Sequence, residues 1–279
     1  MNFKNAIFFS GMAVLLSLLI LNVSNMTYQS SFAAAIEYEH KMKWGSKGFA
    51  NGQFNQASGI TADSENNVYV ADFSGRSNMI QKFTNNGSFI LGFGVLGSGP
   101  QFFTNPSGLV SDSDNNIYIA DFGNPTYAIK KFSSDGKFID SFGSFGLGDG
   151  EFITPGGLGI DKENNIYATD FGENNNVQKF DKNGNFIMKF GKSGNGNGEF
   201  NTPLELAIDS SDNIFVVDQG NNRVQVFNRD GGYITQFGNQ GSIADILQGP
   251  IGIAIDSNSN VYIADGSDSD IHVFSQVKQ

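Results

Sequence analysis

Hydrophobic and polar residues alternate in short blocks along most of the chain. Runs rich in Val, Ile, Leu, Tyr and Phe are separated by clusters of Asn, Asp and Gly. Such runs predict β-strands, and the polar clusters predict turns. Between residues 202 and 238 the four runs lie within the segments 202–209, 212–218, 224–227 and 230–238. Four turns have hairpin chemistry that tolerates positive φ, namely Asn86-Gly87, Asp135-Gly136, Asn183-Gly184 and Asp230-Gly231.

The block pattern repeats along the chain with an almost constant period. An aromatic residue followed by glycine recurs as Trp44-Gly45, Phe93-Gly94, Phe142-Gly143, Phe190-Gly191 and Phe237-Gly238. Successive glycines of this marker are 49, 49, 48 and 47 residues apart. An aspartate ending each N-[VI]-[YF]-x-x-D segment recurs with the same spacings, as Asp72, Asp121, Asp170, Asp218 and Asp265. A period of this length with four antiparallel strands per unit predicts the blades of a β-propeller.

The unit resembles the NHL repeat. Its consensus reads P-x-G-[IL]-x-x-D, N-[VI]-Y-[VI]-A-D, G-N-x-R-[IV]-Q-x-F and D-G-x-[FY]-I-x-x-F-G, and the resemblance covers residues 36–279. The fourth repeat carries the third element nearly whole, as Gly220-Asn221-Asn222-Arg223, whereas the same loop departs from it in the other repeats. The resemblance implies an all-β propeller of the exported prokaryotic type, without a RING or other accessory domain.

The number of strands favours five blades, with six as the alternative. The last repeat supplies three strands and ends at Gln279, so its fourth strand is missing. Residues 36–45 form an additional strand that ends in aromatic-glycine, as every fourth strand does. We therefore expect residues 36–45 to complete the fifth blade and close the ring, which removes an exposed sheet edge.

The first 35 residues have the composition of an export signal. Lys4 is followed by an apolar stretch over residues 6–23, and Ala33-Ala34-Ala35 offers a cleavage site. The alternative is an uncleaved membrane anchor, because the apolar stretch is just long enough to span a bilayer. Either reading predicts a secreted or cell-surface propeller over residues 36–279. The sequon Asn86-Gly87-Ser88 lies in a predicted turn and makes Asn86 a candidate glycosylation site.

Charge and composition exclude two functions known among NHL propellers. Removal of residues 1–35 takes away one lysine and leaves 16 basic and 28 acidic residues, a net charge of −12. Nucleic-acid binding requires a basic surface, so this class of partner is not expected. The chain has no cysteine and therefore no RING zinc site.

The best candidate binding face is the one where second strands end and first strands begin. The five aspartates of the second marker are expected there. Three of them are followed directly by phenylalanine, as Phe73, Phe122 and Phe171. These rings would be stacking platforms for sugars or peptide side chains if exposed, and blade-to-blade packing if buried. The aspartates either contact a ligand or fix the loops of this face.

Glu205 stands where the other repeats place a glycine at the start of the first strand. A carboxylate at the channel mouth, near aspartates of other blades, could hold a divalent cation. That arrangement would suit a metal-dependent lactonase-like or lyase-like propeller enzyme, whereas in the alternative Glu205 simply faces water. We expect no cofactor other than such a cation. We expect the protein to act as a binding scaffold for a protein or carbohydrate partner at the cell envelope.

Overall fold

The computed structural model describes residues 42–73, 77–124, 127–239, 246–267 and 270–275. The expected leader or anchor, residues 1–35, lies outside this part, as do residues 36–41 of the expected closing strand. No helix in the described part is long and apolar enough to cross a membrane.

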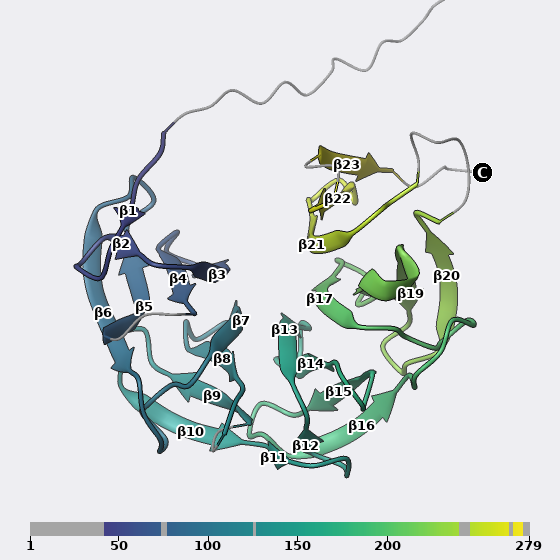
Figure 1. The fold of residues 1–279 in the computed structure, drawn as a ribbon, viewed down its shortest axis with the longest axis horizontal. Coiled ribbons are helices and arrows are strands. Elements are labelled where there is room, and N and C mark those ends of the chain that lie inside the picture. The colour runs from purple at the N-terminus through teal and green to yellow at the C-terminus, as the bar shows by residue number, and fades with distance from the viewer. Residues whose placement is uncertain (1–41, 74–76, 125–126, 240–245, 268–269, 276–279) are drawn as a thin grey trace, which may run out of the picture. The chain divides into compact units, whose positions relative to one another are not determined.

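Five antiparallel sheets follow one another around an arc (Figure 1). Blade one contains β3 (Ala57–Ala62), β4 (Val68–Asp72), β5 (Ser77–Phe83) and β6 (Phe89–Val95). Blade two contains β7 (Pro106–Ser111), β8 (Ile117–Asp121), β9 (Ala128–Phe132) and β10 (Phe138–Phe142). Blade three contains β13 (Pro155–Ile160), β14 (Ile166–Asp170), β15 (Asn176–Phe180) and β16 (Phe186–Phe190). Blade four contains β17 (Pro203–Ile208), β18 (Ile214–Asp218), β19 (Arg223–Phe227) and β20 (Tyr233–Phe237). Blade five contains β21 (Pro250–Ile255), β22 (Val261–Asp265) and β23 (Asp270–Phe274).

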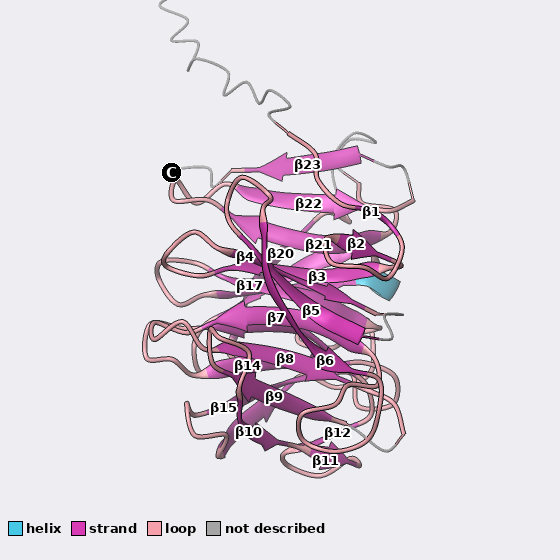
Figure 2. Cartoon of the chain, turned by 90° about the vertical axis from the view of Figure 1, so that its left-hand side faces the viewer, coloured by secondary structure: helices cyan, strands magenta, loops and turns pink. Residues whose placement is uncertain are grey.

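The short elements lie between or beside the blades. Two parallel ribbons pair β1 (Ser46–Lys47) with β2 (Gln53–Phe54), and β11 (Ser144–Phe145) with β12 (Glu151–Phe152). One turn of 3-10 helix, η1 (Gln219–Asn221), lies at one end of the strands (Figure 2). The five-bladed, all-β propeller predicted from the repeats is thereby confirmed.

Each first strand packs against the first strand of the next blade, so β3, β7, β13, β17 and β21 gather on the inner side of the arc (Figure 1). Between β7 and β13 the backbones meet directly. A methyl group added at Gly108 would lie 2.5 Å from the carbonyl oxygen of Gly156. Glycine at these positions therefore lets successive inner strands approach closely.

Aromatic side chains on the outer strands join neighbouring blades. Phe142 at the end of β10 packs on Phe180 of β15, with ring centroids 4.9 Å apart. The ring of Phe142 also lies against Gly184, which has a φ of +79° in the hairpin turn of blade three. The same contact recurs at the other junctions, at centroid distances of 5.0, 4.8 and 4.7 Å for Phe93–Phe132, Phe190–Phe227 and Phe237–Phe274. One aromatic residue per repeat thus fixes each blade to the next.

The two ends of the arc are less covered than its middle. Ile60 on β3 is 65% exposed and Ile271 on β23 is 64% exposed, whereas β8, β14 and β15 are buried throughout. Closure of the ring by residues 36–45 remains a prediction.

Candidate functional site at the propeller mouth

The register of the inner strand pairs brings the predicted site residues to one end of the blades. Asp170, the last residue of β14, lies opposite Pro155, the first residue of β13. The same pairing of a strand-two aspartate with the start of strand one occurs in all five blades. Glu205, near the start of β17, therefore lies at the same end as the five aspartates. We call this end the mouth.

The five mouth aspartates are buried and bind backbone of the loop that precedes their own first strand. In blade one, Asp72 accepts hydrogen bonds from the backbone N–H groups of Asn55 (2.9 Å) and Gln56 (2.7 Å). The equivalent donors are Thr104 and Asn105 for Asp121, Ile153 and Thr154 for Asp170, Asn201 for Asp218, and Gln248 and Gly249 for Asp265. These carboxylates fix the mouth loops, and their oxygens face protein donors.

Two of these aspartates show how burial is compensated. Burial raises the pKa of Asp121, and the ion pair with Lys130, 2.8 Å away, opposes that rise. Burial also raises the pKa of Asp170, against hydrogen bonds from Asn174 and the backbone of Thr154 and Ile153. These partners satisfy the hydrogen-bonding needs of both buried carboxylates.

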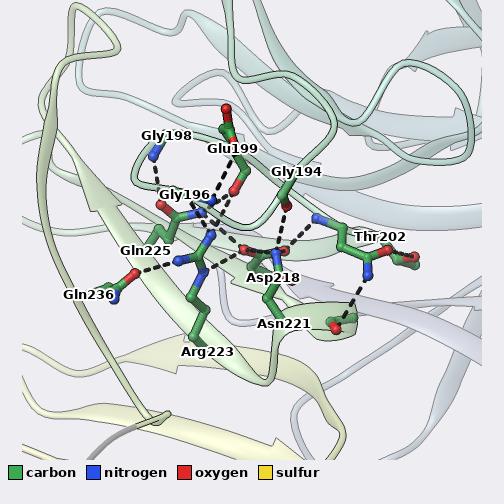
Figure 3. Close-up of polar contacts among 12 residues, drawn as sticks. Gly194, Gly196, Gly198, Glu199, Thr202, Asp218, Asn221, Arg223, Gln225 and Gln236 are labelled. Carbon is green, nitrogen blue, oxygen red and sulfur yellow. Dashed lines mark hydrogen bonds and ion pairs between the residues drawn. The ribbon is translucent and has the colours of Figure 1, made fainter.

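We call each mouth aspartate, together with the loop groups that it binds, a clamp. The Gly-Asn-x-Arg element of the fourth repeat adds the most hydrogen bonds to its clamp (Figure 3). Arg223 Nε donates to Asp218 Oδ2 at 2.7 Å, and its Nη2 donates to the carbonyl oxygens of Gly196 and Glu199 at 2.8 Å each. Asn221 Nδ2 donates to the carbonyl oxygen of Gly194 and to Asp218. In this chain the element therefore holds the loop before β17, because these donors of Arg223 and Asn221 face that loop or Asp218.

Three phenylalanines on consecutive blades form a row at the mouth, which we call the aromatic arc: Phe73, Phe122 and Phe171. The ring centroids of Phe73 and Phe122 are 5.8 Å apart, and those of Phe122 and Phe171 are 6.4 Å apart. The ring planes are inclined by 41° and 70°, and all three residues are half-buried, so the packing leaves part of each residue exposed. In blades four and five the same positions are Gln219 and Gly266, so the arc covers three blades.

Glu205 differs from every mouth aspartate because its carboxylate has no hydrogen bond or ion pair with any described residue. The side chain is half-buried and lies over Gly157 of β13, where an added methyl group would lie 2.7 Å from Glu205 Oε2. Burial raises the pKa of Glu205 to about 7. In the described part of the chain no group of three or more His, Cys, Asp or Glu residues is placed to hold a metal ion.

The glycine pair Gly156-Gly157 leaves room for Phe171 and Glu205, and the sequence patterns did not single it out. An added methyl group at Gly156 would lie 3.3 Å from the ring of Phe171, just as one at Gly157 would meet Glu205. A sequence signal for this pair was present, because β13 alone among the inner strands begins with Pro-Gly-Gly.

Asn86, the candidate glycosylation site, lies in the β5–β6 turn, where its Oδ1 accepts hydrogen bonds from Ser88.

Comparisons with known proteins identify the repeat and the fold. The NHL repeat family model matches residues 103–132, and a model described as a 6-bladed β-propeller matches residues 172–224. The predicted resemblance to NHL-repeat propellers is thus confirmed, although the described residues form five blades. No curated protein is similar enough in sequence to match the chain.

Solved propeller structures resemble this chain in fold. A streptogramin B lyase aligns with a TM-score of 0.58 and 16% identity, over 79% of this chain and 69% of its own. A catalytically inactive virginiamycin B lyase from Staphylococcus aureus with quinupristin gives 0.56 and 16%, over 80% and 71%. A gluconolactonase from Xanthomonas campestris gives 0.56 and 14%, over 75% and 69%. At these identities the likeness concerns the fold alone.

Proposed function

We propose that this NHL-repeat β-propeller is a rigid scaffold that binds a protein or glycan partner at its mouth. The observation that carries the proposal is the aromatic arc, a row of half-buried rings on the face that also carries the unpaired Glu205. Aromatic rings that keep an open surface offer contact area to the flat face of a sugar or to an apolar side chain. Loops at one end of a propeller are a usual place for such sites.

The clamps support a scaffold role because they hold the mouth loops in place before any partner binds. Each loop is fixed through backbone N–H groups or through side chains such as Arg223. A preorganised site loses little conformational entropy on binding, so modest contacts give useful affinity.

The alternative is a metal-dependent lactonase-like or lyase-like enzyme, the activities named for the similar structures above. It would need several carboxylates converging on one ion. The mouth aspartates are buried against backbone donors, which leaves Glu205 as the one half-buried mouth carboxylate described without a partner. This donor set supports a binding scaffold better than a metal centre. The location proposed for the scaffold, outside the cytoplasm, is inferred from the composition of residues 1–35.

Binding to a glycan array and to isolated envelope proteins would test the proposal. We expect the mature protein to bind a ligand that Phe122→Ala binds at least tenfold more weakly. Ile187→Ala, which trims an exposed side chain on the outer strand β16, serves as the control and should bind like the wild type. Equal binding by Phe122→Ala and the wild type, with both folded by circular dichroism, would contradict a mouth site.

A further inference from the structure

We propose that the ligand of the mouth is a glycan that carries amino sugars, with an ammonium group paired to Glu205 and sugar rings stacked on the aromatic arc. This inference rests on the proposed function and names the class of ligand. It combines two groups that lie against consecutive glycines of β13: a carboxylate without a partner among the described residues, and the last ring of a row of aromatic rings.

The charge of Glu205 lacks a counter-ion within the described part of the chain. The other buried or half-buried ion pairs are complete, with Lys82 on Asp63, Lys130 on Asp121, Lys131 on Asp112, Lys179 on Asp161 and Arg223 on Asp218. A carboxylate removed from water without a partner is unfavourable. A cation brought by a ligand would remove that cost.

The carboxylate and the last ring of the arc lie against consecutive residues of one strand. Phe171 covers Gly156, and Glu205 Oε2 covers Gly157. Neither glycine has a side chain that could separate the two groups. A ligand residue bound across this pair of glycines would lie near both groups, and an ammonium group is favoured beside a carboxylate and beside the face of an aromatic ring.

The arc favours a glycan over a single basic side chain. Its rings are on three consecutive blades, with centroids 5.8 and 6.4 Å apart and planes inclined by 41° and 70°, so the row is longer than one side chain needs and each ring has its own orientation. A lysine side chain would use one ring, whereas successive units of an oligosaccharide would each contact a different ring. The chain's net charge of −11 also raises the local concentration of a cationic ligand.

Calorimetric titration with two tetrasaccharides tests this inference. Chitosan tetramer carries free amino groups, and chitin tetramer carries the same sugar rings with the amines acetylated. At pH 7 and physiological salt, which screens non-specific attraction, we expect the wild type to bind the chitosan tetramer at least tenfold more tightly. Glu205→Gln should lose this preference. Glu173→Gln, which removes an exposed charge two residues after Phe171, should keep it.

The outcomes separate this inference from the proposed function. Equal affinity of the wild type for both tetramers, weakened in Phe122→Ala, would overturn the amino-sugar inference and leave the scaffold proposal standing. A preference that persists in Glu205→Gln would also overturn it. Binding of a lysine-rich peptide in place of either sugar would overturn the glycan class. Failure of both tetramers to bind would overturn the amino-sugar inference, and the scaffold proposal would be decided by the glycan array and envelope-protein experiment above. The wild-type comparison needs no variant, so the test holds even if Glu205→Gln does not fold.

Discussion

Trp44 packs on Phe83 of β5, with ring centroids 6.2 Å apart, and its side chain also lies against Gly87 in the turn that follows β5. At the other junctions the outer-strand aromatic of the preceding blade occupies this position. Phe142 of blade two, for example, packs in this way on Phe180 of blade three. Trp44 therefore takes the place of an outer-strand aromatic in a blade before blade one. In a five-bladed ring that blade is blade five, whose described sheet has three strands.

The first prediction concerns ring closure and uses the register of the complete blades. There, the residue before the outer aromatic pairs with the middle of strand three, as Lys189 does with Gln178. The same register would place Lys43 opposite His272. We therefore expect Lys43→Cys with His272→Cys to form a disulfide within one chain under mild oxidation. The link should stabilise the fold by about 5 kcal/mol through the entropy of the unfolded chain.

The chain lacks cysteine, so no other thiol competes in this experiment. Gel mobility without reductant and thermal melts would measure the link. Lys43→Cys with Asp270→Cys, two residues out of register, is the matched control and should link poorly. Absence of any link in the first pair would contradict closure by this segment, and links only between chains would indicate strand exchange.

The second prediction concerns the clamps. Asp218→Asn removes the charge that Arg223 needs, and it leaves the guanidinium buried without an ion pair. Breaking a buried pair in this way costs about 3–5 kcal/mol. Urea denaturation should show this loss, whereas Asp230→Asn in an exposed hairpin turn should change stability little. Similar midpoints for the two variants would mean that the clamp does not hold the mouth loop.

The third prediction concerns the pH dependence that Glu205 gives to stability. Its pKa is raised from 4.5 to about 7 in the folded protein, so between these values the folded state binds more protons than the unfolded state. Stability from this group is fully present below pH 4.5 and is lost as the pH rises through 7, by at most about 3 kcal/mol.

Glu205→Gln should abolish that loss. We expect the unfolding free energy of the variant, relative to that of the wild type, to increase steadily from about pH 5 to about pH 8. Carboxylates with lowered pKa values, such as Asp63 and Asp161, act in the opposite direction at lower pH and are common to both proteins. Parallel curves for the two proteins would show that the carboxyl group titrates normally.

The fourth prediction concerns the amino terminus. Lys4, the apolar stretch and Ala33-Ala34-Ala35 predict cleavage after Ala35. Mature protein purified from its native cell should begin at Ile36 by amino-terminal sequencing. Retention of residues 1–35 in a membrane fraction would establish the anchor instead.

The repeat made the fold predictable, because each unit carries its own strands, turns and aromatic marker. Asn183-Gly184 predicts a hairpin from local chemistry alone. Phe142 belongs to an aromatic marker that recurs once per blade. The position of the mouth followed as well, since Asp170 ends a second strand and antiparallel pairing returns the chain to that end. These are properties of short segments, and a sequence displays them directly.

The tertiary structure decided which mouth groups are available to a ligand. The sequence presented Asp218 and Glu205 as similar carboxylates at one rim. Only the packed blades show that Asp218 binds Arg223 and the backbone of Asn201, while Glu205 lies over Gly157 without a partner among the described residues. The tilted packing of Phe73, Phe122 and Phe171 likewise joins residues 49 positions apart. Hydrogen bonding, burial and stacking depend on neighbours brought together by the ring of blades, and the order of residues along the chain does not contain those distances.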